Sequence, residues 1–444
     1  MDLNNLSKDK IIDIVREYAK NNLSNINYKY KIGDPIRYSG KVFDEEEVVS
    51  LIDSVLEFWL TQGKYYDEFE LKLSKYLNIK YTSFVNSGSS ANLLAISSLT
   101  SDLLKERKLN QGDEVITVAC GFPTTVAPII QNGLKPVFID VDIPTYNVDV
   151  SGLSNALSDK TKAVFFAHTL GNPFDIKTVI DFCKKNNLWL IEDNCDSLGA
   201  EVLIDNKYKL TGTIGDIGTS SFYPAHHITT GEGGAVYTDN PILHKIVMSL
   251  RDWGRDCICK SGVDNTCNKR FTGQYGELPF GYDHKYVYSH FGYNLKATDM
   301  QAAIGVKQIE KLPKFVEKRR KNFDLINKML IDNKLDEYFI LPEATKDSKP
   351  SWFSFILTCR ENVDREKVIK YLDENKVHTR MLFAGNIIKQ PMFINLDKSK
   401  YRVATELKNT DQIMNKTFMV GVYPGLDTDS IEYMVNIIKK SVNR

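Results

Sequence analysis

Four cysteines are spaced in a way that could bind a metal centre. Cys195, Cys257, Cys259 and Cys267 follow the pattern C-x61-C-x-C-x7-C, and the last three lie in RDCICKSGVDNTCNKR, whose Gly, Asp, Asn and Lys content predicts a loop. Four thiolates can hold a tetrahedral zinc ion or an iron–sulfur cluster. The C-x-C step fits the paired C-x2-C knuckles of structural zinc poorly, which favours a cluster, with unrelated surface thiols as the alternative.

Other candidate residues follow apolar, strand-like runs. Gly88 and Ser89, in NSGSSA (86–91), would open a helix whose N–H groups can bind a phosphate, although a simple helix cap is an equal alternative. Asp193 ends the run LWLIED, where a carboxylate can pair with a protonated ring nitrogen or simply belong to a loop. The stretch SFYPAHHITTGEGG (221–234) carries His226, whose imidazole can move protons near neutral pH.

These residues must be positioned by an alternation of strands and helices. Seven strand-like runs are expected, at 83–86, 113–119, 135–142, 162–168, 188–194, 217–222 and 234–239, and helical segments separate the first five. This order predicts an α/β fold with a mainly parallel, seven-stranded sheet covered on both faces. Ligands bind at the carboxyl ends of such strands. A long helix, roughly 299–330, should follow.

Three parts of the chain are expected. Residues 1–50 form an N-terminal helical segment, residues 51–330 form the large domain with the cysteine loop 257–267, and residues 331–444 form a smaller α+β domain. The 444-residue length allows one large and one smaller domain.

Composition excludes several functional classes. Lys+Arg and Asp+Glu each total 57, so no basic face for nucleic acid is implied. No apolar run approaches a membrane span, and the charged N-terminus lacks a secretory signal, so we expect a cytoplasmic protein.

The odd count of seven cysteines argues against a disulfide framework. Cys120, Cys183 and Cys359 are expected to be buried free thiols.

Four motifs occur in an order that resembles a known family. They are NSGSSAN (86–92), IEDNCDSLGA (191–200), the stretch 221–234 and GYNLKATDMQAAIG (292–305). Over about residues 35–440 the chain resembles the sugar aminotransferases, pyridoxal-phosphate (PLP) enzymes with the aspartate-aminotransferase fold (fold type I). In that family, the stretch 221–234 carries a lysine that binds the cofactor covalently. Here that position is His226.

The lysine-to-histidine replacement resembles the 3-dehydrases of 4-keto-6-deoxyhexoses, a branch of the same family. Together with the four extra cysteines it is similar to the iron–sulfur enzymes that act on CDP-4-keto-6-deoxy-D-glucose. The resemblance implies C3 dehydration of a nucleotide-linked sugar in 3,6-dideoxysugar and lipopolysaccharide O-antigen synthesis. It also implies non-covalent pyridoxamine phosphate, a [2Fe–2S] cluster on the four cysteines, and an NAD(P)H-dependent flavin/iron–sulfur reductase as partner.

The resemblance also implies roles for individual residues. Gly88, Ser89 and Ser221 would bind the cofactor phosphate, with Asn294 reaching it from the neighbouring subunit of a homodimer. Phe122, in CGFPTT, would stack on the pyridine ring, and Asp193 would pair with the ring nitrogen. Asp196 stands where aminotransferases usually have glutamine near the ring hydroxyl, so its contact departs from the family pattern. His226 would be the catalytic base. Because Cys195 is two residues beyond Asp193, a cluster would lie about 7 Å along the chain from that carboxylate.

Three alternatives remain open on the sequence. The first is a sugar-nucleotide aminotransferase that uses another lysine, such as Lys296 or Lys209. The second is a cluster-free dehydrase of a GDP-linked sugar that reduces its cofactor by transamination. The third is a non-catalytic sugar-nucleotide binder in which the cysteines hold zinc.

Overall fold

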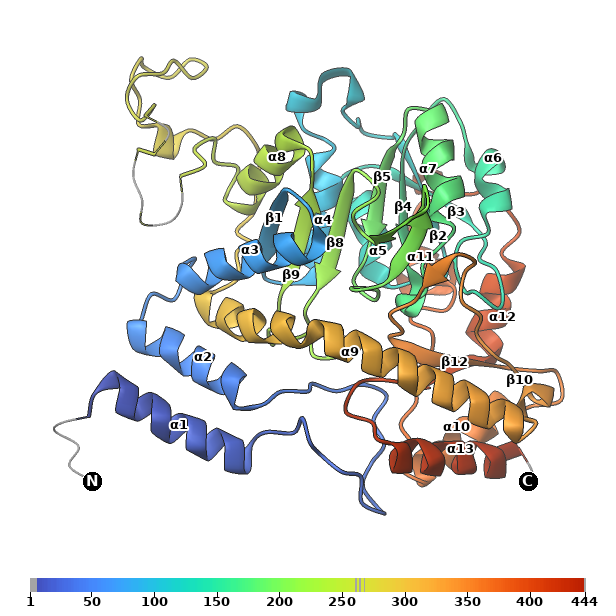
Figure 1. The fold of residues 1–444 in the computed structure, drawn as a ribbon. Helices are drawn as coiled ribbons and strands as arrows, with labels where there is room; N and C mark the ends of the chain where they lie inside the picture. The colour runs from blue at the N-terminus through green and yellow to red at the C-terminus, as the bar shows by residue number, and fades with distance from the viewer. Residues whose placement is uncertain (1–5, 260–261, 263–264, 267, 443–444) are drawn as a thin grey trace.

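A central sheet of eight strands forms the body of the molecule (Figure 1). The computed structural model describes residues 6–259, 262, 265–266 and 268–442. The strand order is β1-β9-β8-β5-β4-β2-β3-β13, and within this sheet β9 alone runs against the others. The strands are β1 (Tyr81–Val85), β2 (Glu114–Val118), β3 (Lys135–Ile139), β4 (Thr161–Ala167), β5 (Trp189–Asp193), β8 (Ile217–Ser221), β9 (Gly234–Thr238) and β13 (Arg402–Val403).

The seven predicted strands are all present in this sheet, and the mainly parallel α/β architecture is confirmed. The count of seven was one too low, because the C-terminal part of the chain returns to add β13 beside β3. This strand pairs over two residues, too few to leave a pattern in the sequence.

Helices cover both faces of the sheet. The α-helices are α1 (Lys8–Asn22), α2 (Glu45–Glu57), α3 (Lys64–Leu77), α4 (Gly88–Ser98), α5 (Pro123–Gln131), α6 (Leu153–Ala156), α7 (Ile176–Lys185), α8 (Pro241–Arg251), α9 (Asp299–Asp332), α10 (Arg365–Glu374), α11 (Pro391–Ile394), α12 (Lys408–Lys416) and α13 (Thr428–Val442). The helical segment expected between the first two strands is interrupted: α4 ends at Ser98, and a 3-10 helix follows over Asp102–Arg107. Ser101 caps that second helix through its side chain, which starts a new element where the sequence pattern continues.

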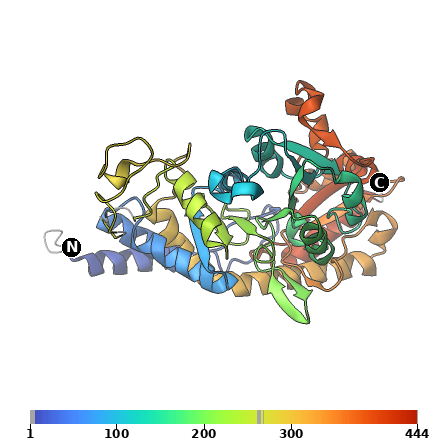
Figure 2. The same ribbon diagram turned by 90° about the horizontal axis from the view of Figure 1, so that it is seen from above.

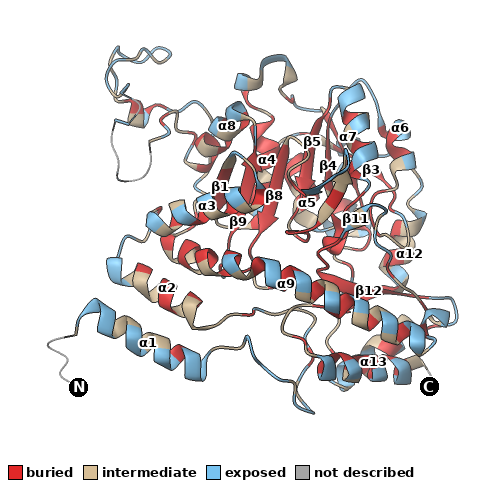
Figure 3. Ribbon diagram, in the orientation of Figure 1, coloured by how far each residue is buried: buried red, intermediate tan, exposed pale blue. Residues whose placement is uncertain are grey.

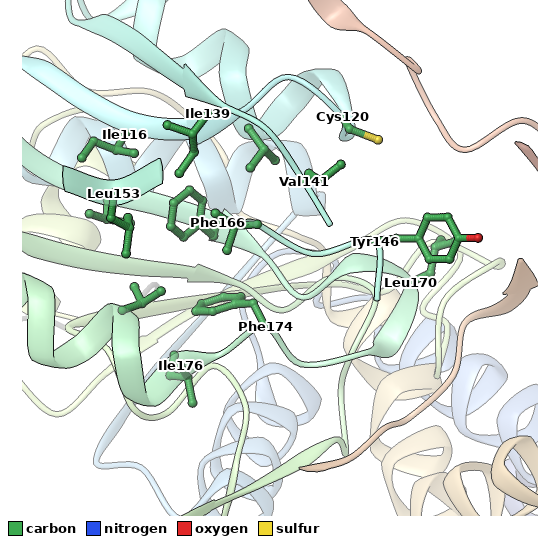
Figure 4. Packing of buried hydrophobic residues seen from close by; sticks show 14 of the residues in the cluster. Ile116, Cys120, Ile139, Val141, Tyr146, Leu153, Phe166, Leu170, Phe174 and Ile176 are labelled. Atoms are coloured by element: carbon green, nitrogen blue, oxygen red, sulfur yellow. The ribbon is translucent and has the colours of Figure 1, made fainter. Parts of the chain in front are cut away.

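Alternate residues of the buried strands pack on opposite faces. Ile116 and Phe166 belong to the core that includes α6 and α7, drawn in Figure 4, whereas Val115 and Phe165 belong to the core that includes α4 and α8. The central strands are buried along their whole length, as the red strands of Figure 3 show. Burial on both faces explains why these strands read as continuous apolar runs.

A second core lies in the C-terminal part of the chain. The antiparallel strands β10 (Phe339–Ile340), β12 (Ser354–Cys359) and β14 (Thr417–Gly421) pack with α10 and α13. A further small sheet joins β11 (Ser348–Lys349) to the hairpin β6 (Glu201–Ile204) and β7 (Lys207–Leu210).

The helix α9 runs below the sheet and reaches the C-terminal core (Figures 1 and 2). Its first half buries side chains such as Val306 and Leu312 in a core shared with α3 and β1. Its second half adds Phe323 and Ile326 to the C-terminal core. A capping box at Thr298 and Gln301 fixes its start. The division of the chain into segments 1–50, 51–330 and 331–444 stays a prediction.

The cysteine loop leaves the body of the molecule after α8, and the described part of it contains no strand or α-helix between α8 and α9 (Figure 1). The chain before and after the loop is held together by the backbone pairing of Arg255 with Tyr288 and by a hydrogen bond between Asp256 and His284 at 2.7 Å. Cys267 lies outside the described residues. No helix in the described part of the chain is long and apolar enough to cross a membrane.

Candidate active site

The carboxylate of Asp193 lies at the carboxyl end of β5 and is held by three donors. Its Oδ2 accepts hydrogen bonds from Asn92 Nδ2 at 2.8 Å and from Thr125 Oγ1 at 2.7 Å, and its Oδ1 accepts the backbone N–H of Cys195 at 3.2 Å. Asn92 is itself fixed, because its Oδ1 accepts a hydrogen bond from Thr219 Oγ1 at 2.6 Å. The side chain therefore has one defined orientation at the strand end, suited to pairing with a protonated ring nitrogen.

The N-terminus of α4 meets the end of β8. A Cβ on Gly88 would lie 2.4 Å from the Cβ of Ser221, so this approach requires glycine. Ser87 caps the helix by accepting the N–H of Ser90, and the N–H groups of Gly88 and Ser89 are among the first of the helix, which have no acceptor within it. These donors and the Ser221 hydroxyl form a cradle that suits a phosphate.

His226 lies on the turn that follows β8 and is mostly buried. Its Nδ1 has no hydrogen-bond partner and lies 3.5 Å from Oδ1 of Asp196. Burial lowers the pKa of the imidazole to about 4, against the attraction of the Asp193 carboxylate. Burial, with the nearby charge of Asp193, raises the pKa of the Asp196 carboxyl to about 8. The imidazole and the carboxyl face each other closely enough to exchange protons through a small movement.

Arg319 of α9 supports the turn that carries His226. Its guanidinium is fully buried and donates hydrogen bonds to the carbonyl oxygens of His226 (3.1 Å), Trp352 (3.1 Å) and Phe353 (3.2 Å). The ring of Phe353 packs against the imidazole, with 5.4 Å between ring centroids. One cation thus ties the histidine turn to the segment that leads into β12.

Phe122 is the N-cap residue of α5, and its side chain is half-exposed. Thr125, in the first turn of the same helix, donates to Asp193, so the aromatic ring belongs to the same strand-end region as the carboxylate. An exposed aromatic face can stack on a planar ring. Together with the anion cradle and the fixed carboxylate, it suits a phosphorylated, planar heterocycle with a protonated nitrogen.

The other histidines near the site have structural contacts. His168 accepts the N–H of Phe174 at Nδ1, so its Nε2 donates to Glu192 at 3.0 Å, and both side chains are fully buried. Glu192 also accepts the N–H groups of Gly212 and Ile214 at 2.7 Å each. His227 is buried and donates from Nε2 to the carbonyl oxygen of Ser351 at 2.7 Å. These contacts give His168 and His227 structural roles.

The described cysteines are not gathered into one centre. Across the part of the chain that the structure describes, no group of three or more His, Cys, Asp or Glu side chains is arranged to hold a metal ion. Cys257 and Cys259 line one small pocket in the loop beyond α8, whereas Cys195 follows Asp193 at the strand end. Cys120, Cys183 and Cys359 are buried free thiols, as expected.

Asn294 is exposed in the single chain. Its backbone pairs with Asp252, and the next residue, Leu295, accepts the N–H of Asn86 at 2.9 Å. The segment that carries Asn294 therefore borders the start of the phosphate cradle, while its side chain is available to another molecule.

Sequence reasoning missed three residues that shape this site. Asn92 and Thr125 stand in the quoted motifs NSGSSAN and CGFPTT, so their proximity to two strand ends was a usable signal. Arg319 has a subtler signal, since it falls on the same helix face as the apolar Phe315 and Phe323.

Comparison with known proteins places this geometry in a family. The model of the DegT/DnrJ/EryC1/StrS aminotransferase family matches residues 42–439. The lipopolysaccharide biosynthesis protein RfbH of Salmonella typhimurium is 53% identical over 439 residues, which are 98% of each chain. A dTDP-4-dehydro-2,6-dideoxy-D-glucose 3-dehydratase of Saccharopolyspora spinosa is 45% identical over 98% of this chain and 92% of its own.

A solved structure matches over most of the chain. It is the E. coli GDP-4-keto-6-deoxy-D-mannose-3-dehydratase with bound hydrated PLP, with a TM-score of 0.79, 29% identity, and coverage of 91% of this chain and 99% of that one. The fold is thus that of the PLP enzymes of fold type I. The protein belongs to the DegT/DnrJ/EryC1/StrS aminotransferase family.

Proposed function

We propose that this protein removes the C3 hydroxyl of a nucleotide-linked 4-keto-6-deoxyhexose, with pyridoxamine phosphate as cofactor. The observation that carries the proposal is His226, an imidazole with an unpartnered Nδ1 at the position where the family's aminotransferases have lysine. Imidazole moves protons but cannot hold the cofactor covalently. Relatives from Saccharopolyspora spinosa and Yersinia pseudotuberculosis, 45% and 32% identical, are 3-dehydratases of such sugars.

The cofactor would supply a primary amine that condenses with the sugar ketone and a pyridine ring that withdraws electrons. Gly88, Ser89 and Ser221 would bind its phosphate, helped by Asn294 of a second subunit. Asp193 would hold its ring nitrogen protonated, and Phe122 would stack on the ring. The carboxyl of Asp196 faces the imidazole of His226 and would orient the ring.

His226 would do the proton transfer that dehydration requires. Its imidazole would accept the proton released from the aminomethyl carbon of the bound cofactor and return it to the C3 hydroxyl, which leaves as water. Arg319 holds the backbone of the turn in place, so the imidazole has little freedom to move away.

The first test is His226→Asn, with His378→Asn as the matched control because the site makes no use of His378. We expect His226→Asn to bind pyridoxamine phosphate as the wild type does and to lose at least about 100-fold in dehydration rate. Product formation by chromatography and cofactor binding by absorbance titration measure the two properties separately. Turnover at the wild-type rate would refute the assignment.

The nucleotide of the substrate is proposed to be CDP, on the resemblance alone. Assays with the CDP-, dTDP- and GDP-linked 4-keto-6-deoxyhexoses decide the point, since kcat/KM should be highest for the CDP sugar.

The aminotransferase alternative has less support, because Lys296 Nζ is engaged with Asp252 at 3.1 Å and Lys209 lies on the hairpin strand β7. The aminotransferase alternative predicts that the cofactor is bound to a lysine and absorbs visible light, and that the enzyme transfers an amino group from glutamate.

We further propose a [2Fe–2S] cluster on Cys195, Cys257, Cys259 and Cys267, reduced by a partner reductase. The support is the residue type, the spacing and the position of Cys195 beside Asp193. Because the described cysteines are not gathered, we derive no reaction step through a cluster, and the cluster-free dehydrase, reduced by transamination, is an equal candidate.

Metal analysis separates these candidates. Anaerobically purified protein should contain iron and sulfide and should lose visible absorbance on addition of dithionite. Cys257→Ser should abolish both signals, whereas Cys183→Ser, at a buried thiol elsewhere, should leave them unchanged. Zinc, or no metal, would contradict the cluster and favour the zinc-stabilised or cluster-free alternatives. The homodimer and the cytoplasmic location also stay predictions, the first testable by light scattering.

A further inference from the structure

A loop from the C-terminal part of the chain packs on the turn that carries Phe122. The backbone N–H of Ala384 donates to the carbonyl oxygen of Gly121 at 3.3 Å, and the N–H of Ile387 donates to that of Ala119 at 3.0 Å. Two backbone hydrogen bonds thus fix residues 384–387 against residues 119–121, at the end of β2. The loop therefore packs beside Phe122 even though it lies far from Phe122 in the sequence.

Phe383, in this loop, has a backbone conformation that a bulky residue rarely adopts. Its φ is 45°, in the left-handed region that favours glycine. The neighbours hold it there: Leu382 is buried, and Asn386 donates from Nδ2 to Asp411 Oδ1 at 2.7 Å. A side chain kept at a strained position by its surroundings points to a use for that side chain.

The ring of Phe383 contacts the ring of Phe122 edge to face. Their centroids are 5.5 Å apart, and the ring planes meet at 87°. This is the arrangement that aromatic pairs favour, and it restrains the rotation of the half-exposed Phe122 ring. Thr125, one turn further along α5, donates to Asp193, so the restrained ring lies on the helix that also contributes a donor to the proposed ring-nitrogen site.

We propose that Phe383 is a positioning residue for the cofactor, acting through Phe122. The inference rests on the proposed function, in which the cofactor has no covalent anchor and is retained by its phosphate, its ring nitrogen and its stacking partner. A stacking ring held in one orientation by Phe383 binds a planar heterocycle without first losing rotational freedom. The loop from the C-terminal part of the chain therefore contributes to cofactor affinity without touching the cofactor.

The test measures cofactor binding to full-length variants. Phe383→Leu should raise the Kd for pyridoxamine phosphate by about 2- to 12-fold, the loss expected for one edge-to-face pair. It should also weaken the circular dichroism band of the bound pyridine ring. Phe383→Tyr keeps an aromatic ring and should restore both values. The matched control is Phe393→Leu, which breaks another edge-to-face pair, 5.8 Å from Phe138, without touching Phe122.

The outcomes separate this inference from the proposed function. If the wild type does not bind pyridoxamine phosphate, the proposed function fails. If the wild type binds it and Phe383→Leu binds equally well, with an unchanged dichroism band, the role of Phe383 is refuted and the proposed function stands. An equal loss in Phe393→Leu would also refute the role, because it would indicate a general loosening of the loop.

Discussion

Alanine at position 88 should destroy the phosphate cradle. The added Cβ would lie 2.4 Å from Ser221 Cβ, 2.8 Å from its Oγ and 3.1 Å from its Cα. Carbon atoms pack at about 3.5–4.0 Å, so the start of α4 and the end of β8 must separate by about 1 Å or more. A donor displaced by that distance no longer makes a hydrogen bond of normal length.

The magnitude follows from the hydrogen bonds that are lost. Hydrogen bonds to a charged group are worth about 1.5–3 kcal/mol each, so losing two of them costs about 3–6 kcal/mol. Gly88→Ala should therefore weaken pyridoxamine phosphate binding by roughly two to four orders of magnitude. Ser221→Ala keeps the Cβ and removes only the hydroxyl, which predicts a smaller loss of about 10- to 150-fold.

Equilibrium titration of the apoprotein, followed by cofactor absorbance, gives the Kd of each variant. The double variant Gly88→Ala/Ser221→Gly removes the two shortest contacts but leaves the one to Cα, so it should bind better than Gly88→Ala and no better than Ser221→Ala. Gly121→Ala is the control, because its added Cβ meets no atom within 4 Å. Gly88→Ala binding like the wild type, or a double variant no better than Gly88→Ala alone, would refute the cradle.

Three further predictions concern the charged groups. Arg319→Met removes the donor of three carbonyl oxygens, so it should lower the free energy of unfolding by about 3 kcal/mol or more. Urea denaturation measures this change, and an unchanged midpoint would contradict the prediction. Burial lowers the pKa of His244 to about 4, so His244 should account for about 2 kcal/mol of the stability that the wild type loses between neutral pH and pH 5, because the unfolded chain takes up the proton. His244→Phe, which can keep the stacking on Tyr81 at 4.6 Å, should show a flatter pH profile of melting temperature, and an equal slope would reject the assignment. Asp193→Asn should retain phosphate-driven cofactor binding and lose at least about 100-fold in turnover, and equal activity would exclude the ring-nitrogen role.

Much of the fold could be predicted because its strands are buried on both faces. Runs such as those around Val115 and Phe165 are mostly apolar, and each ends in a change of composition. The strand β13 could not be predicted, since a two-residue pairing depends on where the distant C-terminal chain returns. The reversed direction of β9 likewise depends on the path of the chain and leaves no periodic signal.

The candidate site was predicted where its residues follow strands. Asp193 and Ser221 end β5 and β8, and Gly88 begins the helix after β1, so their meeting follows from the parallel sheet. The contact of Phe122 with Phe383 could not be predicted, because it joins two loops with no shared pattern. Arg319 was missed although a charged residue on an apolar helix face is a visible anomaly.

The 34-residue helix α9 has a mechanical consequence for how the site can open. It is about 51 Å long and is embedded in both cores, so the two parts of the molecule cannot rotate apart without bending it. The helix is weakest at Pro313, which has no N–H to donate and lies between the two embedded halves. Arg319, which grips the turn of His226, lies less than two turns beyond that point. A force that bends α9 at Pro313 would therefore be transmitted through Arg319 to the turn that carries His226.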